Sequence, residues 1–581
     1  MTRRRKAVLL GVGLLAASVS SAVDRYVSAD GKYGEGLGEC YTDLQTAVTA
    51  AQNDETVWVT NGFVCASGIG GNKARIDVPN RRITIRSQAG LVDEAKGLGA
   101  TIKGPGTSCA DADQARCIYF NGTTAKLIGF VLEDGYPNAN GGAVAGNASL
   151  IKNCVVRNSR GDKRGGGVAT VLCEDCVITN NYAIEMGGGV YYSTRLSGCT
   201  VAHNRTDGYG GGVGTWAPSA NTFYTNCWFH GNYSKSYGGG LGFRGGPGPV
   251  FIVDCVISNN TTALQQRGAG CGCEQRAAKL YDCDIVENVA TNSSGVGLAG
   301  CVATDCRILR NIGISNGTTY SLGVGAYSCT LTNCVVSFNT NDCLVAGKMY
   351  ACGGGLYGGA KTDKEDLSSQ AVNCRFEGNY ANYRGGAMYG NCETRNCTVV
   401  GNVALGGGAG AWSGEHYNGL FVGNAGNGIM DYEASGNTSS CAVNCTFVGN
   451  ASEQGLGFYQ IGTAINCVSW GNGRTSGGVS SPYDYAYKAV SNCCCAVMPQ
   501  VRAGGDVYGC FVADPKFRTI EGKDYYVGSK DCKNASLPFD WMTDANDARS
   551  KDVYGNPRVI GTAADLGAAE SKIFGLTIFI R

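Results

Sequence analysis

A short segment built around one cysteine recurs along the middle of the chain. From residue 153 onward, Asn or Asp is followed by Cys, any residue, an apolar residue, two further residues and Asn. The frame occurs thirteen times, once with Gly419 in the place of Cys, and most successive copies lie 22 to 28 residues apart. Glycine clusters separate the copies, for example GGGV at 165 and GGAM at 385. A period of this length is typical of a solenoid, in which each repeat packs against its neighbours.

The spacing within each copy predicts β-strands. Side chains two residues apart lie on the same face of a strand, so the cysteine and the following apolar residue share one face. Twelve of the thirteen second positions are apolar, and this face must therefore be the interior. A helical solenoid is disfavoured because helix formers are sparse and glycine is dense, with 90 residues. The leucine spacing of leucine-rich repeats is also missing. Coils stacked about 4.8 Å apart would form a rod about 60 Å long, so the predicted fold is all-β, a single parallel β-helix solenoid.

The cysteines and asparagines of the repeat have structural explanations. Cysteine behaves as a small buried hydrophobic residue, and equivalent amides on stacked coils can bond one another. Asparagine also tolerates the left-handed conformation, and we expect the asparagine that closes each strand to adopt it. The predicted cysteine ladder comprises Cys176, Cys199, Cys227, Cys255, Cys283, Cys306, Cys334, Cys374, Cys397, Cys445 and Cys467. The predicted asparagine ladder comprises Asn181, Asn204, Asn232, Asn260, Asn288 and Asn311.

A second set of cysteines precedes the ladder cysteines by three to five residues. It consists of Cys173, Cys301, Cys329, Cys392 and Cys441. The CEDC segment at 173–176 has a spacing found in zinc sites, but one such segment without a partner pair is a weak signal. Buried thiols without metal are the favoured interpretation. The 30 cysteines also permit disulfides, whose pairing the sequence does not determine.

The first 22 residues are predicted to be a signal peptide. Four basic residues at 3–6 precede an apolar run at 7–19 and a small-residue cleavage site at 20–22. Without this segment the formal net charge falls from +1 to −3, which leaves no basic field for nucleic acid. No later segment contains 18 consecutive apolar residues, so no transmembrane helix is predicted. We therefore expect export to the cell surface, the outer membrane or the extracellular space.

The remainder of the chain divides into three regions. Residues 23–150 are expected to form an N-terminal cap and irregular first coils, with an amphipathic helix over 43–53 that covers the open end of the stack. Residues 151–475 carry the regular cysteine and asparagine repeat. Residues 476–581 are expected to form the last coils and a tail that packs along or over them.

These motifs resemble known families of exported proteins. The alternation of GGGV or GGAM with CRFEGN and CTFVGN resembles the repeats of polymorphic outer-membrane proteins. The opening DLQTAVTAAQNDETVWVTNG and the closing DPKF, DYYVGS and GNPRVIGTAADLGAAE resemble exported bacterial β-helix proteins of the pectate-lyase-like superfamily, including members with a C-terminal anchor-type module. The resemblance implies a right-handed β-helix at the cell surface or outside the cell, with an adhesive role. It also implies an enzymatic alternative, since polysaccharide lyases and hydrolases of that superfamily act along one outer face.

The candidate catalytic residues are Asp254, Asp282 and Asp305, which occupy the same place on three consecutive coils. Each directly precedes an inward-facing cysteine, and because side chains alternate along a strand, these aspartates should point outward. Stacked carboxylates repel one another unless a cation such as Ca²⁺ lies between them or one is protonated. A close carboxyl pair could also serve a retaining glycosidase. Because Asn fills this position in most coils, a turn residue at the strand entry is the favoured interpretation. The three histidines, His203, His230 and His416, are expected to be ordinary exposed residues.

Tyr209, Tyr237 and Tyr383 precede glycine clusters and are candidates for stacking against a glycan, although aromatic packing that shields the turns is favoured. The 40-residue interval between Cys334 and Cys374 contains KTDKEDLSS at 361, the best candidate for a projecting loop. The leading hypothesis is a non-catalytic exported scaffold that binds a glycan or adheres to cells. The alternative is a polysaccharide lyase or glycoside hydrolase. No cofactor is predicted, Ca²⁺ being a possible exception, and the oligomeric state is not determined.

Overall fold

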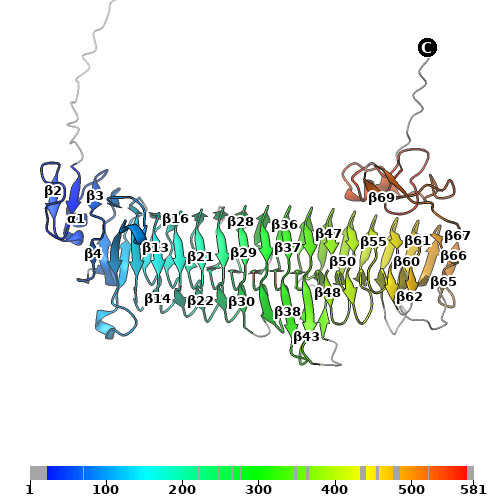
Figure 1. Cartoon of the computed structure of the whole chain (residues 1–581), viewed down its shortest axis with the longest axis horizontal. Coiled ribbons are helices and arrows are strands. Elements are labelled where there is room, and N and C mark those ends of the chain that lie inside the picture. Colours follow the sequence, from blue (N-terminus) through cyan, green and yellow to red (C-terminus); the bar gives the residue numbers. More distant parts are fainter. Residues whose placement is uncertain are drawn as a thin grey trace, which may run out of the picture.

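The chain folds into a right-handed parallel β-solenoid of about 15 turns. Figure 1 shows the coils stacked into a rod. The computed structural model describes residues 23–571, apart from positions 70, 123, 219–221, 247, 264–265, 275, 346–349, 361–365, 432–439, 453–456, 475–483 and 521. The predicted signal peptide at 1–22 and the last residues, 572–581, lie outside the described residues. The predicted fold class and its right-handedness are confirmed.

Each regular coil contributes four short strands that pair in parallel with the next coil. We call the strand after the glycine cluster row 1 and number the following strands as rows 2, 3 and 4. In one coil these are β23 (Val213–Trp216), β24 (Thr222–Thr225), β25 (Trp228–His230) and β26 (Tyr233–Ser234). They pair in turn with β27 (Leu241–Arg244), β28 (Val250–Val253), β29 (Val256–Ser258) and β30 (Thr261–Thr262).

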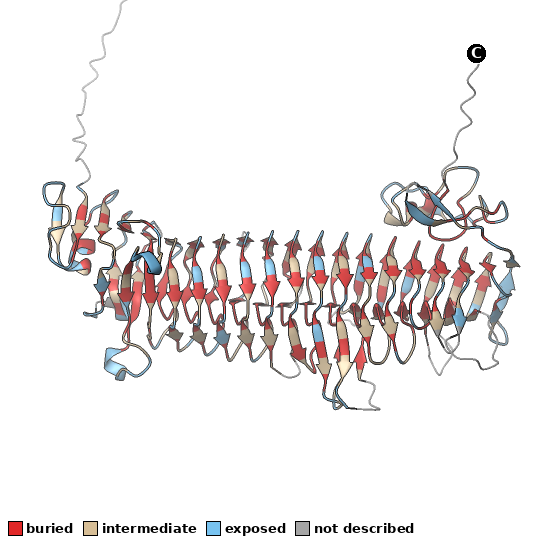
Figure 2. Cartoon of the chain, viewed as in Figure 1, coloured by how far each residue is buried: buried red, intermediate tan, exposed pale blue. Residues whose placement is uncertain are grey.

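The inward side chains of the strands fill the interior, and Figure 2 marks buried residues in coil after coil along the rod. All eleven cysteines of the predicted ladder are buried. The backbone N–H of Cys227 donates to the sulfur of Cys255 at 3.4 Å, so these thiols lie on adjacent coils. The apolar residues two positions later are also in register, as Phe229 and Ile257 illustrate. The alternation of inward and outward residues thus explains why the two positions repeat together.

The asparagine ladder runs through the turn between rows 3 and 4. The Asn232 amide nitrogen donates to the Asn260 side-chain oxygen at 3.1 Å, and Asn260 repeats this contact to Asn288 at 3.0 Å. The expectation that these asparagines are left-handed is wrong. The residue before each of them has the positive φ, for example Asn259 at 54°. The asparagine that follows is buried, and its side chain bonds to the next coil, as Asn260 does to Asn288.

The glycine clusters permit close contact between coils where row 4 turns into row 1. A Cβ placed on Gly211 would lie 2.4 Å from the carbonyl oxygen of Gly239 in the next coil, closer than any real side chain approaches. Gly210, immediately before it, has a φ of +69°. Glycine is therefore needed at Gly211 because a side chain would collide with the next coil, and it is favoured at Gly210 because of its left-handed backbone.

A short helix covers the N-terminal end of the solenoid (Figure 1). At the N-terminal end, α1 (Leu44–Ala50) begins at Asp43, which caps it by accepting from Thr46 N–H at 2.7 Å. Leu44, Ala47 and Val48 enter the core, as the predicted amphipathic pattern requires. Within the described part of the chain, no helix is both long and apolar enough to cross a membrane.

The C-terminal segment folds back over the outside of the last coils (Figure 1). Turn asparagines of those coils hold it, since the Asn418 amide donates to the carbonyl oxygens of Arg549 and Lys551, both at 2.8 Å. The Asn466 amide likewise donates to Leu537 O at 3.0 Å. These asparagines lie in the turn between rows 2 and 3, and they bind the C-terminal segment while still bonding to each other from coil to coil, as Asn418 does to Asn396 at 3.0 Å.

Candidate functional site

One outward position of row 1 forms a column of side chains along the solenoid. It lies in the middle or at the end of each row 1 strand, and the strand register stacks its members directly. In the second half of the solenoid the members are aromatic, with Tyr327 and Tyr357 stacked at 5.1 Å and 2° between ring planes. Four consecutive earlier coils carry only glycine or alanine there. From Tyr191 to Trp412 the column consists, in chain order, of Tyr191, Gly214, Gly242, Gly272, Ala299, Tyr327, Tyr357, Tyr389 and Trp412, and the same register extends it to Ala145 and Ala169 before Tyr191.

A groove of about 650 Å³ lies where the column lacks large side chains. Its floor consists of small residues on β31 (Cys271–Cys273), on β35 (Leu298–Ala299) and directly after it: Gly272, Ala299 and Gly300. Tyr237 bounds the groove toward the N-terminus and Tyr327, on β40 (Ala326–Tyr327), bounds it toward the C-terminus. The volume is in the range of ligand sites in proteins. The hollow therefore arises because glycine and alanine occupy the column where other coils carry aromatic residues, and the loop residues Asp366 and Leu367 add only part of its wall.

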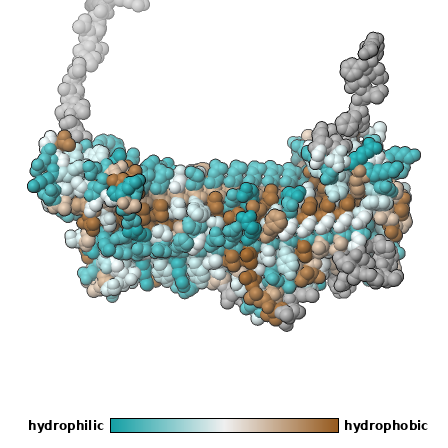
Figure 3. All heavy atoms as spheres, in the orientation of Figure 1, coloured by the Kyte–Doolittle hydropathy of each residue, from teal (hydrophilic) through white to brown (hydrophobic). Residues whose placement is uncertain are grey.

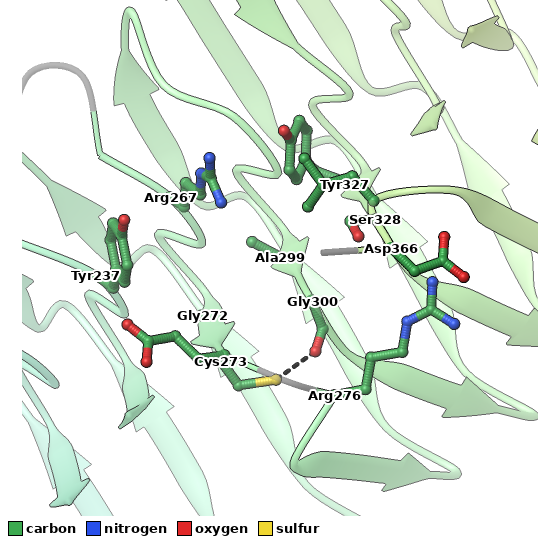
Figure 4. Close-up of a pocket in the computed structure, with 12 residues that line it drawn as sticks. Tyr237, Arg267, Gly272, Cys273, Arg276, Ala299, Gly300, Tyr327, Ser328 and Asp366 are labelled. Atoms are coloured by element: carbon green, nitrogen blue, oxygen red, sulfur yellow. Dashed lines mark hydrogen bonds between the residues drawn. The ribbon is translucent and has the colours of Figure 1, made fainter. Parts of the chain in front are cut away.

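Two arginines stand on opposite sides of the floor, as Figure 4 shows. The Arg267 guanidinium lies over the Tyr327 ring, 5.0 Å from its centroid. Arg276 is held by its two terminal nitrogens, which donate to Ser368 O at 2.6 Å and to Thr330 Oγ1 at 3.1 Å. Both guanidinium groups are therefore positioned by neighbouring coils and border the same space.

Two carboxylates and one thiol also border the groove. Glu274 pairs with Arg244 of the preceding coil, with 3.5 Å between Oε1 and Nε. Asp366 comes from the 40-residue interval, and in Figure 4 the Arg276 side chain extends toward it. The Cys273 thiol donates to the carbonyl oxygen of Gly300 on the floor. The lining thus offers cationic, anionic, aromatic and hydrogen-bonding groups within one small volume.

The structure brings two of the three candidate tyrosines together. Tyr209 and Tyr237 meet edge to face with 5.6 Å between ring centroids, and Tyr237 lines the groove. Tyr209 is one coil away, where its hydroxyl accepts from Arg244 at 2.7 Å. Tyr383 is not among the lining residues. It lies several coils further on, with the Arg384 guanidinium 4.4 Å from its ring centroid.

The three candidate aspartates lie in a different place. Asp254, Asp282 and Asp305 are exposed residues of the turn between rows 2 and 3, with φ angles of 52°, 51° and 55°. Elsewhere Asn occupies this left-handed position, and its amides bond coil to coil, as between Asn396 and Asn373 at 3.1 Å. None of the three lines the groove.

No cluster of three or more His, Cys, Asp or Glu side chains in the described chain is arranged to hold a metal ion. This applies to the stacked aspartates considered for Ca²⁺ and to the CEDC segment considered for zinc. Of the second cysteine set, Cys173, Cys301, Cys329 and Cys392 are buried and Cys441 is half-buried.

The expectation for the histidines is wrong for His416. Its side chain is fully buried, with Nδ1 2.8 Å from Thr394 Oγ1 and Nε2 3.0 Å from Ser413 O. Burial lowers the pKa of His416 to about 4. His203 is exposed and His230 half-buried, their rings 5.1 Å apart, and burial lowers the pKa of His230.

The predicted projecting loop is only partly described. Residues 361–365 lie outside the described residues, whereas Asp366 and Leu367 form part of the groove wall. Within the same interval, β43 (Thr340–Cys343) projects beside β38 (Ile312–Ser315), and an apolar region marks this place in Figure 3. Ile312 in β38 and Leu344 and Val345 directly after β43 are exposed.

Sequence reasoning missed most of the groove, namely Arg267, Cys273, Glu274, Arg276 and Tyr327, whereas Asp366 lies in the segment predicted as a projecting loop. A usable signal existed for Tyr327, since aligning the glycine clusters shows the change from glycine to aromatic residues at one fixed position. Arg267 occupies the same position before a glycine cluster as Tyr209 and Tyr237.

No family model and no curated protein matches the chain. Among solved structures, it is similar to a mutant of the PL6 family alginate lyase AlyGC, with 10% identity and a TM-score of 0.34 over 82% of this chain and 71% of that one. A mannuronic acid specific polysaccharide family 6 lyase from human gut microbiota has 13% identity and a TM-score of 0.29, over 75% and 87%. Tailspike protein 3 of bacteriophage CBA120 has 11% identity and a TM-score of 0.20, over 81% and 59%. Function must therefore be inferred from the groove itself.

Proposed function

We propose that the protein is an exported β-helix scaffold that binds a glycan in the groove over β31, β35 and β40. The observation that carries this proposal is the gap in the outward column, bordered by Tyr237, Tyr327 and two arginines. Sugars present apolar ring faces and many hydroxyl groups. Tyrosine complements both, because its ring is flat and apolar and its hydroxyl is polar.

The charged lining supports recognition of a glycan rather than of an apolar ligand. Arg267 and Arg276 present guanidinium donors, and Glu274 and Asp366 present acceptors. A sugar with several hydroxyl groups can bond both kinds at once. The rigid coils hold these groups in place, which reduces the ordering required on binding.

We assign no catalytic step to the groove. In the proposed scaffold, residues 151–475 form the solenoid that carries the ligand, residues 1–22 serve as an export signal, and residues 476–581 form an anchor-like end region. Presentation of the solenoid at the cell surface or outside the cell agrees with this arrangement.

A glycan-binding screen tests the proposal. Purified mature chain would be applied to plant, algal and host polysaccharides, and hits measured by calorimetry for the wild type, Tyr237→Ala and Arg267→Ala. We expect both variants to lose at least about tenfold in affinity, equivalent to about 1.4 kcal/mol. Tyr383→Ala is the matched control, because its ring lies outside the groove, and it should bind as the wild type does.

The same samples test the enzymatic alternative. Each polysaccharide hit would be incubated with and without Ca²⁺, and chain length followed by chromatography. Turnover that disappears in Asp282→Ala would replace the scaffold proposal by a lyase or hydrolase acting at the row 2–3 turn. Equal binding by wild type, Tyr237→Ala and Arg267→Ala would remove the groove as the binding site.

A further inference from the structure

The groove contains a thiol that solvent can reach. Most of the 30 cysteines are buried, and reagents in solution can reach them only if the coils open. The half-buried ones are Cys40, Cys109, Cys273, Cys343, Cys441 and Cys510. Among the residues that line the groove, Cys273 carries the one thiol.

A second thiol lies directly behind it. The sulfurs of Cys273 and Cys301 are 3.7 Å apart, although the residues belong to adjacent coils. Gly300 permits this approach, since a Cβ on it would lie 2.3 Å from the carbonyl oxygen of Cys273, and its φ is +66°. Cys301 is fully buried, and its sulfur also lies 3.8 Å from that of Cys271. One accessible thiol and one protected thiol therefore meet at the floor.

We propose that Cys273 and Cys301 form a reactive pair that reduces a small-molecule disulfide entering the groove. The Cys273 thiolate attacks one sulfur of that disulfide, its S–S bond breaks, and half of the reagent leaves as a thiol. The Cys301 sulfur then attacks the Cys273 sulfur in the mixed disulfide, and its proton passes to the departing sulfur of the reagent. The second half of the reagent leaves as a thiol, and a Cys273–Cys301 disulfide remains. The protein pair loses two electrons and two protons, which the added disulfide gains.

The positions of the thiols assign the order of these steps. Exposure makes Cys273 the sulfur that meets the reagent, whereas Cys301 has no route to it except through Cys273. Hydrogen bonding to the neighbouring thiols of Cys271, Cys273 and Cys329, together with burial, holds the pKa of Cys301 well above its usual range. Cys301 therefore stays protonated while Cys273 reacts first.

The geometry also permits the final bond. A disulfide bond is about 2.05 Å long, so the two sulfurs must approach by roughly 1.6 Å from their separation of 3.7 Å. The buried ladder thiols also lie near one another, but they have no exposed member to start the reaction. This inference does not depend on the proposed glycan binding, because it concerns only the thiols and the groove that admits the reagent.

The test uses folded full-length protein and oxidised glutathione as the probe. After quenching with a thiol-blocking reagent, a non-reducing tryptic digest separates peptide 268–276, which contains Cys271 and Cys273, from peptide 280–307, which contains Cys301. We expect these peptides to become cross-linked with loss of two hydrogens, and fragmentation to place the bond on Cys273. In Cys301→Ser the second step is blocked, so Cys273 should instead keep the glutathione adduct.

Cys283→Ser is the matched control, because it removes a buried ladder thiol carried by the same tryptic peptide and should cross-link as the wild type does. Circular dichroism checks that each variant is folded, and Cys301→Ala provides a second substitution if Cys301→Ser is not. A bond at Cys271, a glutathione adduct that persists on Cys273 in the wild type, or an unmodified Cys273 would each overturn the proposal.

Discussion

At the scale of single residues, the buried asparagine side chains connect the coils more specifically than the apolar core does. The Asn260 side chain takes part in four hydrogen bonds: it donates to Phe229 O and to Asn288, and it accepts two from Asn232. We expect Asn260→Ala to lower the free energy of unfolding by about 3 kcal/mol, because it leaves several buried polar groups unpaired. Chemical denaturation measures the change.

Asn259→Gly is the control for that substitution. Asn259 is adjacent and exposed, and glycine retains its positive φ, so its effect should stay below about 0.5 kcal/mol. Equal losses in the two variants would show that the turn, rather than the amide ladder, supplies the stability.

His416 makes stability depend on pH. Its pKa is lowered by burial to about 4 in the folded chain, below the ordinary 6.5. The unfolded chain therefore binds the proton more readily than the folded chain. The contribution of the buried, neutral His416 to the free energy of unfolding is complete above pH 6.5 and is lost as the pH falls toward 4. The difference corresponds to about 3 kcal/mol. Denaturation at pH 7 and pH 4.5 should show a smaller loss in His416→Gln than in the wild type, and equal losses would contradict this role.

At the scale of strands and coils, the sequence pattern predicts the regular part well and the groove poorly. Alternation within each copy identifies inward residues such as Cys255 and Ile257, because residues two apart in an extended segment point to the same face and both of these are buried. The groove combines residues from several coils that no single copy contains. Arg276 lies in the connection after β31, and Asp366 belongs to the one interval of 40 residues, so no repeated pattern places either one.

The column in row 1 gives a prediction about how the groove arises. Ala299→Tyr would supply a large side chain at the position held by Tyr327 on the next coil, and the strand register places the two side by side. We expect the fold to be retained and glycan binding to fall at least about tenfold, since the new ring fills the hollow. Circular dichroism and calorimetry measure the two effects.

Ala299→Ser tests whether size alone is responsible, because serine adds one small atom at the same site. It should bind as the wild type does. Unchanged binding by Ala299→Tyr would show that the ligand does not enter over β35.

At the scale of the whole molecule, a compact C-terminal module lies against the side of the rod, and buried charged groups bond its own segments to one another. The Arg558 guanidinium is fully buried and donates to the carbonyl oxygens of Asp565 and Gly567. The Glu570 carboxylate accepts from Asp565 N–H at 2.8 Å, and Asp552 accepts from Glu570 N–H at 2.9 Å. The module reaches the solenoid at Thr446, whose Oγ1 accepts from Ala568 N–H at 2.8 Å.

Glu570 should make the C-terminal module less stable as the pH rises. Burial raises its pKa to about 8, although the nearby Arg558 acts in the opposite direction. Because the folded pKa lies above the ordinary 4.5, the stabilisation from Glu570 is complete below pH 4.5 and is lost as the pH rises through 8. Hydrogen exchange at pH 6 and pH 9, corrected for intrinsic rates, should show weaker protection of residues 552–571 at pH 9. In Glu570→Gln the neutral amide replaces the protonated acid, so protection should change little between the two values, and an equal loss in both proteins would contradict this role. The expected slope is opposite to that of His416, so the free energy of unfolding of the chain should be highest between the two transitions.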